Sequence, residues 1–231
     1  AGMTESLLQR LEEVEKRIET AARKVGRAAS EITLIAVSKT HPVSVLREAI
    51  AAGARVFGEN KVREAESKIT EIGREAGAAQ WHLIGHLQSN KARKAVRLFD
   101  AIHSIDSVEL AERLERICIE EKRASLPVFA QADLASEATK SGISEKDLPE
   151  LIEFLRRCRH LKLEGLMVLP PFFEEAERAR PFFRRLRELR DELEPGGKLS
   201  MGMSHDFEIA IEEGATHVRV GTAIFGERAR I

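Results

Sequence analysis

The feature that most constrains the fold is a regular alternation of apolar runs with amphipathic stretches along the whole chain. Each apolar run has the length of a buried β-strand, and each stretch between runs repeats its apolar residues at helical spacing. Strands are expected at 32–38, 54–58, 81–85, 101–105, 127–132, 163–169, 199–203 and 218–225. Helices are expected at 43–52, 62–76, 108–122, 148–158, 174–193 and 207–213.

Strands that are joined through helices run parallel, because crossover connections of this kind are right-handed. Eight such units favour a closed TIM (β/α)8 barrel, in the α/β class, over the alternative of an open doubly wound sheet. An additional helix is expected before the first strand, since Leu7, Leu11, Val14 and Ile18 repeat at helical spacing and Thr4 can cap it. No linker interrupts the pattern, so we expect a single domain over 3–231, with Ala1 and Gly2 as a cloning remnant.

Composition excludes several classes of function. The chain has 37 basic and 38 acidic residues and a net charge of −1, which shows no bias toward nucleic acid or a membrane surface. No run approaches the roughly 20 apolar residues of a membrane span. The two cysteines, Cys118 and Cys158, form no metal-binding or redox pattern and are expected to be free thiols in the reducing cytoplasm.

In a parallel barrel, functional residues gather at the carboxyl ends of the strands. Lys39 ends the first expected strand and Asn60 ends the second. The third contains His82 and His86 on one face, but four strand residues span roughly 13 Å, too far for two ligands of one metal ion. We therefore expect no metal site, with His82 in the core and His86 at the rim of a pocket.

The last two expected strands end in segments rich in glycine and hydroxyl groups, at 200–204 and 219–226. Barrels frequently bind phosphate with the loops that follow these two strands. Gly202, Gly221 and Gly226 allow close approach of the backbone to an anion, and Ser204 and Thr222 add hydroxyl donors. The pattern predicts a phosphate site.

Arg219 lies two residues before Gly221 and shares its face of the strand. If this face lines the barrel interior, the buried guanidinium needs a partner, either an interior carboxylate or a heteroatom of a ligand. Val218 and Val220 would then pack against the helices.

Several long segments together resemble the pyridoxal phosphate homeostasis protein family. The matching segments run in order from about residue 34 to 228: LIAVSK, FGEN, WHLIGHLQSNK, HSIDS, GLM-LP, LSMGMSHDFE and VRVGTAIFGER. The resemblance implies a barrel like the N-terminal domain of alanine racemase, with pyridoxal 5′-phosphate held as a Schiff base on Lys39. It also implies phosphate contacts from Ser204, Gly221 and Thr222, with Arg219 beside the pyridine nitrogen and Asn60 near the ring.

The same resemblance implies a protein that carries and buffers the cofactor and supplies it to apo-enzymes. Members of this family influence amino-acid and keto-acid balance without an established catalytic reaction, so no enzyme activity is expected. Lys140 aligns with a second lysine linked to cofactor exchange, and His86 and Met201 are further candidates for pocket or exchange roles. Lys61 departs from the family pattern after FGEN, which puts the role of that position in question. A monomer is expected, because no second domain follows the barrel.

Two alternatives use the same residues. A pyridoxal phosphate-dependent racemase would also use the lysine. Resemblance to racemases of this barrel type, however, implies a tyrosine that acts as a base and a second domain that completes the site. This chain contains no tyrosine. His86 is the only substitute base we identify. An aldolase-like barrel would form its Schiff base with a sugar phosphate, but the order of the segments and the place of Lys39 on the first strand favour the cofactor-binding family.

Overall fold

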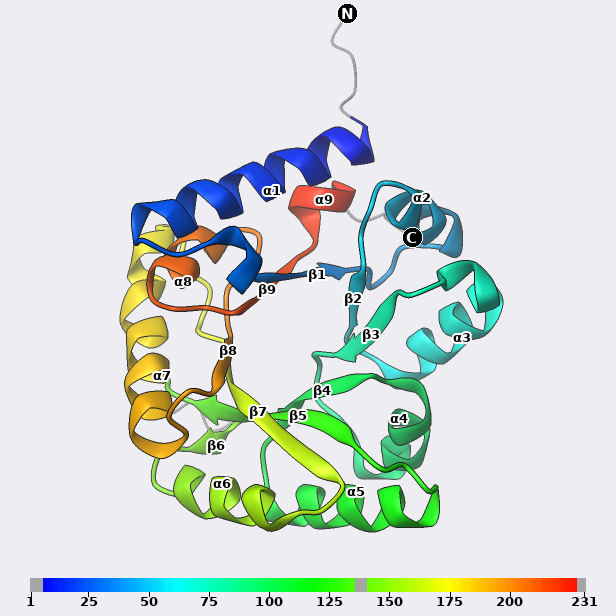
Figure 1. Cartoon of the computed structure of the whole chain (residues 1–231), viewed down its shortest axis with the longest axis vertical. Helices are drawn as coiled ribbons and strands as arrows, with labels where there is room; N and C mark the ends of the chain where they lie inside the picture. The colour runs from blue at the N-terminus through cyan, green and yellow to red at the C-terminus, as the bar shows by residue number, and fades with distance from the viewer. Residues whose placement is uncertain (1–5, 136–140, 228–231) are drawn as a thin grey trace, which may run out of the picture.

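The computed structural model describes residues 6–135 and 141–227 and shows a closed parallel β-barrel surrounded by helices (Figure 1). Its strands are β1 (Thr33–Val37), β2 (Val56–Glu59), β3 (Gln80–Leu83), β4 (Ala101–Ile105), β5 (Leu126–Asp133), β6 (Ile143–Ser144), β7 (Leu161–Val168), β8 (Lys198–Ser200) and β9 (His217–Val220). Their order is β4-β3-β2-β1-β9-β8-β7-β5, and pairing of β4 with β5 closes the ring. The short β6 pairs only with the end of β5, outside this ring. The predicted barrel is therefore confirmed.

Helices cover the outside of the barrel in the described part of the chain. They are α1 (Leu7–Lys24), α2 (Val43–Ala51), α3 (Val62–Ile72), α4 (Ala92–Leu98), α5 (Val108–Glu120), α6 (Leu148–Arg157), α7 (Arg180–Leu193), α8 (Phe207–Glu212) and α9 (Thr222–Phe225). Short 3-10 turns lie at Ala29–Glu31, Gly73–Ala76, Ser89–Lys91 and Ala176–Ala179.

The additional N-terminal helix is α1, which packs across α8 and α9 near the end of the chain. Ser6 caps it, since its Oγ accepts the Gln9 N–H at 3.1 Å while Gln9 Oε1 accepts the Ser6 N–H at 2.9 Å. Thr4, the cap expected from the sequence, lies outside the described residues. The four apolar residues at helical spacing are all buried: Leu7, Leu11, Val14 and Ile18. Each contributes roughly 1.5–3 kcal/mol through removal of its side chain from water.

Three features differ from the sequence-based expectation. The eighth strand, expected at 218–225, ends at Val220, because the backbone turns at Gly221 into the helical turn α9. Both α4 and β6 are additional elements. The first has only seven residues and the second two, too few to show a period of their own.

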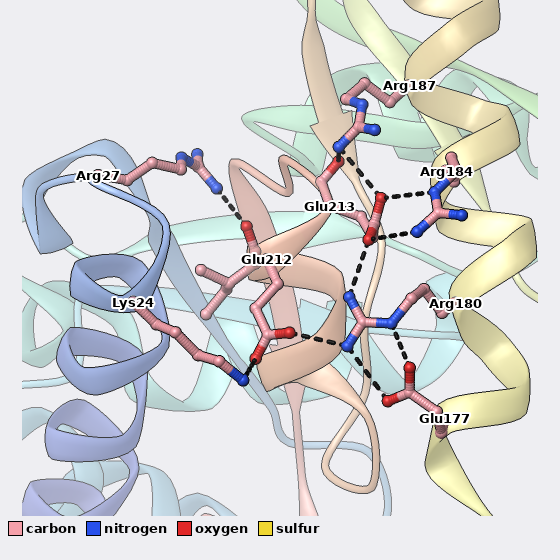
Figure 2. A network of polar contacts seen from close by, with 9 residues as sticks. Lys24, Arg27, Glu177, Arg180, Arg184, Arg187, Glu212 and Glu213 are labelled. Carbon is pink, nitrogen blue, oxygen red and sulfur yellow. Dashed lines mark hydrogen bonds and ion pairs between the residues drawn. The ribbon is translucent and has the colours of Figure 1, made fainter.

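A network of arginine and glutamate side chains ties α1, α7 and α8 together (Figure 2). The buried Glu213 side chain accepts contacts from three arginines of α7: Arg180, Arg184 and Arg187. Its neighbour Glu212 bridges Arg180 of α7 at 2.7 Å and Lys24 of α1 at 3.3 Å. Burial opposes ionisation of Glu213, but the hydrogen bonds from the arginines outweigh it and lower the pKa of this carboxyl. Because α8 ends here and leads into β9, the network lies at the amino ends of the strands and supports the barrel from the side opposite its mouth.

Candidate functional site

Two adjacent pockets open at the carboxyl ends of the strands. The larger is a cavity of about 720 Å³, and its lining includes Lys39, Asn60, Lys61, His86 and Arg219. The smaller has about 350 Å³, and its lining includes Ser204, Gly221 and Thr222. Three residues line both: Lys39, Leu169 and Met203. Lys39 therefore lies where the two pockets meet.

The larger pocket is strongly cationic. Lys61, Arg63 and Lys91 join Lys39 and Arg219 in its lining, and no carboxylate is among the described residues around it. A concave surface lined by one sign of charge concentrates ions of the opposite sign. The pocket is therefore suited to an anionic ligand.

Asn60 is held in place by the chain of the neighbouring loop. The residue follows β2, and the backbone of Gly85, just after β3, packs directly against it. A Cβ atom at Gly85 would lie 2.3 Å from the Asn60 carbonyl oxygen and 2.7 Å from its Cα. The absence of a side chain at Gly85 lets the two strand ends converge at the pocket.

This close approach leads to a prediction for Gly85→Ala. The new methyl group must push the backbone of Asn60 away, and overpacking of this kind costs about 1–3 kcal/mol. Urea unfolding should show a loss at the upper end of that range, together with weaker ligand binding in the larger pocket. Gly26→Ala is the control: its Cβ meets no atom within 4 Å, and only its left-handed φ of 71° opposes the change, for about 1 kcal/mol. An equal loss in both variants would show that the two loops separate without cost.

In the smaller pocket, Ser204 is fixed by backbone donors. Its Oγ accepts the Gly221 N–H at 3.0 Å and the Ala223 N–H at 3.4 Å. Because Oγ accepts both bonds, its own hydrogen is directed away from this loop and is available to an acceptor in the pocket. Ser204 thus occupies two of the loop's backbone N–H groups and presents its own hydroxyl to the pocket, the donor that the sequence analysis expects there.

Arg219 is fully buried at 0% exposure and also lines the larger pocket. Its Nη2 donates to the Val168 carbonyl at 3.0 Å and its Nη1 to Ser200 Oγ at 3.3 Å, while Nε has no hydrogen-bond partner within the described structure. Burial lowers the pKa of Arg219 to about 10, although the nearby Asp206 carboxylate partly offsets this by raising it. The group is charged at neutral pH and retains one buried N–H for a ligand atom.

The flanking valines, Val218 and Val220, lie in the hydrophobic core, as the alternation along the strand predicts.

Comparison with known families matches residues 10–229 to the alanine racemase N-terminal domain. A pyridoxal phosphate homeostasis protein of Aquifex aeolicus is 41% identical over 225 residues, which cover 95% of this chain and 97% of the relative. One of Pseudomonas aeruginosa is 43% identical over 227 residues and covers 96% of each chain. This chain belongs to the pyridoxal phosphate homeostasis protein family. The resemblance expected from the sequence segments is confirmed.

Solved structures agree with this assignment. PipY of Synechococcus elongatus, a structure with pyridoxal phosphate bound, has a TM-score of 0.84 and 40% identity over 96% of this chain and 100% of its own. Alanine racemase of Corynebacterium glutamicum has a TM-score of 0.63 at 20% identity and shows the fold alone. This family member spans 60% of that longer racemase chain. Among the described residues, no helix is long and apolar enough to cross a membrane.

Beneath the pocket, a chain of hydrogen bonds crosses the barrel interior from Arg219 to β3. Ser200 Oγ lies 2.8 Å from His103 Nδ1, and His103 Nε2 lies 2.9 Å from His82 Nδ1. His82 Nε2 in turn lies 3.2 Å from Gln80 Oε1. If Ser200 Oγ, which accepts from Arg219, gives its own hydrogen to His103, every following bond runs in the same direction and the chain ends at the acceptor Gln80 Oε1. Each histidine then receives one hydrogen bond, donates one and is neutral.

Burial also favours the neutral form of these rings. It lowers the pKa of His82 to about 4 and that of His217, which packs beside them, to about 3. The pKa of His103 falls well below its ordinary value, through burial first and then through the nearby His82, His217 and Arg219. His82 is thus a hydrogen-bonded core residue, as expected, and its partner His103 is a member of the chain that the sequence analysis does not identify.

The remaining candidate residues divide. His86 is exposed and lines the larger pocket, as does Lys61. Met201, a candidate for a pocket or exchange role, is 0% exposed in the hydrophobic core, whereas Met203 lines both pockets. Met201 and Leu199, two residues apart, both lie in the hydrophobic core, on the face opposite Ser200, whose side chain points into the barrel interior. Lys140 lies outside the described residues.

Leu169, Arg63 and Lys91 also line the larger pocket and are absent from the sequence prediction. Lys91 falls inside the resembling segment WHLIGHLQSNK, which was a usable signal. Leu169 also carried one, because it ends the expected strand 163–169 and falls inside the resembling segment GLM-LP. Arg63 is one of many charged residues on amphipathic helices.

Proposed function

We propose that this single barrel domain binds pyridoxal 5′-phosphate through a Schiff base to Lys39 and stores and supplies the cofactor. The observation that carries the proposal is the place of Lys39 in the linings of both pockets, between Arg219 on one side and the Ser204–Thr222 loops on the other. The names of the relatives and the ligand of the PipY structure support the same cofactor.

The residues fit this group. When bound, pyridoxal phosphate supplies an aldehyde that condenses with the Lys39 amine and releases one water molecule. The guanidinium of Arg219, which lines the larger pocket, suits the pyridine nitrogen, which is an acceptor when unprotonated. The hydroxyls of Ser204 and Thr222 and the backbone at Gly221 suit the phosphate, and Asn60 lies on the side of the larger pocket, where the ring would be.

We infer a carrier without catalytic activity. The charged Arg219 disfavours a proton on the pyridine nitrogen, because a second positive charge would lie beside it, and this weakens the ring as an electron sink. The chain also has no tyrosine to act as the base of a racemase. Lys39 would then form and release its bond reversibly, and apo-enzymes would receive the released cofactor.

Reduction with borohydride tests the proposal. The purified protein, loaded with pyridoxal phosphate, should absorb visible light, lose that absorbance on reduction, and carry the phosphopyridoxyl mass on a peptide that contains Lys39. Label on another lysine, or a colourless protein that takes up no added cofactor, would refute it. Deuterium incorporation at the α-carbon of alanine during turnover would instead establish a racemase, with His86 as the candidate base.

A further inference from the structure

The backbone around Lys39 adopts an unfavourable conformation. The Ser38 carbonyl accepts the His41 N–H at 3.1 Å, which forms a tight turn with Lys39 and Thr40 at its centre. Thr40 has a φ of 67°, in the left-handed region. Turns with a positive φ at this third position favour glycine or asparagine, and a β-branched residue is strained there. Such strain persists only where the surrounding structure enforces it, and it is common at functional sites.

Two side chains of α3 hold the two sides of this turn. Lys68 Nζ donates to the Ser38 carbonyl at 2.6 Å, immediately before Lys39. Glu64 Oε2 accepts the Thr40 N–H at 3.0 Å, immediately after it. Lys68 and Glu64 are themselves joined at 2.9 Å, so the turn is held from both sides by one connected pair.

A third charge anchors this pair in the protein interior. Glu59, at the end of β2, lies 2.7 Å from Lys68 Nζ, and its side chain is 0% exposed. The Lys68 side chain is 9% exposed. Desolvation makes buried ion pairs a poor source of stability, so this pair requires another reason for its presence. The hydrogen bond from Lys68 to the Ser38 carbonyl, immediately before Lys39, provides one.

We propose that Lys68, oriented by Glu59 and supported by Glu64, is a positioning residue that fixes the 38–41 turn and so directs the Lys39 amine into the pockets. None of these three residues is in the lining of either pocket, so Lys68 acts through Lys39 and not on the ligand. This inference rests on the proposed function of Lys39. It assigns a role to charges that neither the cofactor site nor the core packing uses.

The main test compares Lys68→Met with wild type and with Lys94→Met. Methionine keeps most of the apolar stem of the side chain and removes the donor to Ser38. A companion variant combines Lys68→Met with Glu59→Gln, so that the Glu59 carboxylate is not left buried without its partner. Lys94 is the matched control, because it is a helical lysine paired with Glu66 on the surface, away from the turn. In the cofactor-free protein, hydrogen exchange of the peptide containing Thr40 and His41 should accelerate in the Lys68 variants only.

The second readout is pyridoxal phosphate binding, followed by the visible absorbance of the Lys39 adduct. The dissociation constant should rise about tenfold in both Lys68 variants and stay unchanged in Lys94→Met, a difference of about 1.4 kcal/mol. A folded Lys68→Met protein with wild-type affinity and wild-type exchange would overturn the proposal. Failure of wild type to form an adduct at Lys39 would refute the proposed function instead, and the exchange rates would still show whether the turn depends on Lys68.

Two further variants keep the test decisive if Lys68→Met does not fold. Glu64→Ala removes the acceptor for Thr40 and the outer partner of Lys68 from a partly exposed site and should weaken binding about threefold. Thr40→Gly removes the strain, so adding it to Glu64→Ala or to Lys68→Met should restore most of the affinity. A purely structural role for Lys68 would lower the unfolding temperature without this rescue, and rescue that fails in both backgrounds would contradict the proposal.

Discussion

Acidification from pH 6.5 to pH 5 is expected to remove about 4 kcal/mol of the protein's free energy of unfolding. The cause is the group of buried neutral histidines in the barrel interior: His82, His103 and His217. In the unfolded chain, each takes up a proton below about pH 6.5. In the folded protein, burial keeps them neutral down to pH values of about 4 for His82 and about 3 for His217. Their contribution to stability is therefore fully present above pH 6.5 and is lost as the pH falls toward the folded pKa values.

Glu59 acts in the opposite direction. Burial, opposed by Lys68, raises its pKa to about 7, so below that pH the folded form holds a proton that the unfolded form, with a pKa near 4.5, does not. On unfolding, the three histidines each take up a proton and Glu59 releases one, so the net uptake is about two protons. Since each proton corresponds to about 1.4 kcal/mol per pH unit, the slope is about 3 kcal/mol per pH unit. The total is comparable to the lower end of the roughly 5–15 kcal/mol that stabilises a typical domain.

Urea unfolding followed by circular dichroism at pH 7.5, 6.5, 5.5 and 5.0 measures this slope. Replacement of one titrating ring, His82→Gln, should reduce the slope by about 1.4 kcal/mol per pH unit. A free energy of unfolding that is constant between pH 7 and pH 5 would show that these rings are already charged in the folded protein.

The second large effect is expected at Lys39. Lys39→Ala removes the amine that forms the covalent bond, so the visible absorbance should be absent and retention of pyridoxal phosphate on desalting should fall at least about hundredfold, or about 2.7 kcal/mol. The fold should survive, because Lys39 follows β1 in a partly exposed turn. Equilibrium dialysis together with a spectrum of the retained fraction provides the measurement.

Lys61→Ala is the matched control for this loss. Lys61 is a second lysine in the lining of the larger pocket, so its removal changes the pocket's charge by the same amount. The visible absorbance of the Lys39 adduct should persist in Lys61→Ala, and the affinity for pyridoxal phosphate should fall by no more than a few-fold. If both variants lost the adduct equally, the charge of the pocket would explain binding better than a bond at Lys39.

Much of the fold could be predicted because a parallel barrel repeats one simple pattern. The parallel sheet and the helix before β1 follow from apolar periodicity, and the count of eight units favours closure of the sheet over an open one. Apolar periodicity fails where a short run suits a strand and a helical turn equally well. Residues 222–225, Thr-Ala-Ile-Phe, are such a run, and they form a helical turn. The turn at Gly221, not the composition of the run, decides between them.

The site divides in the same way. Lys39, Asn60 and Arg219 could be identified because strand ends meet at the mouth of any parallel barrel. Lys68 could not, because it is one of many lysines on amphipathic helices, and His103 opens the resembling segment HSIDS without any sign there of its partners. Their importance depends on which atoms face them across the fold, and that information appears only when α3 packs against the turn and β4 against β8.

The hydrogen-bond chain beneath Arg219 also limits how this barrel can diverge. With Ser200 as the donor to His103, each histidine accepts one hydrogen bond and donates the next, so all the bonds of the chain point in the same direction. A single replacement in the middle reverses or interrupts that polarity and leaves a buried polar atom unmatched on each side. The buried members His82, His103 and Ser200 are therefore expected to be inherited as a set, and a lineage that replaces one of them must rebuild the floor of its pocket.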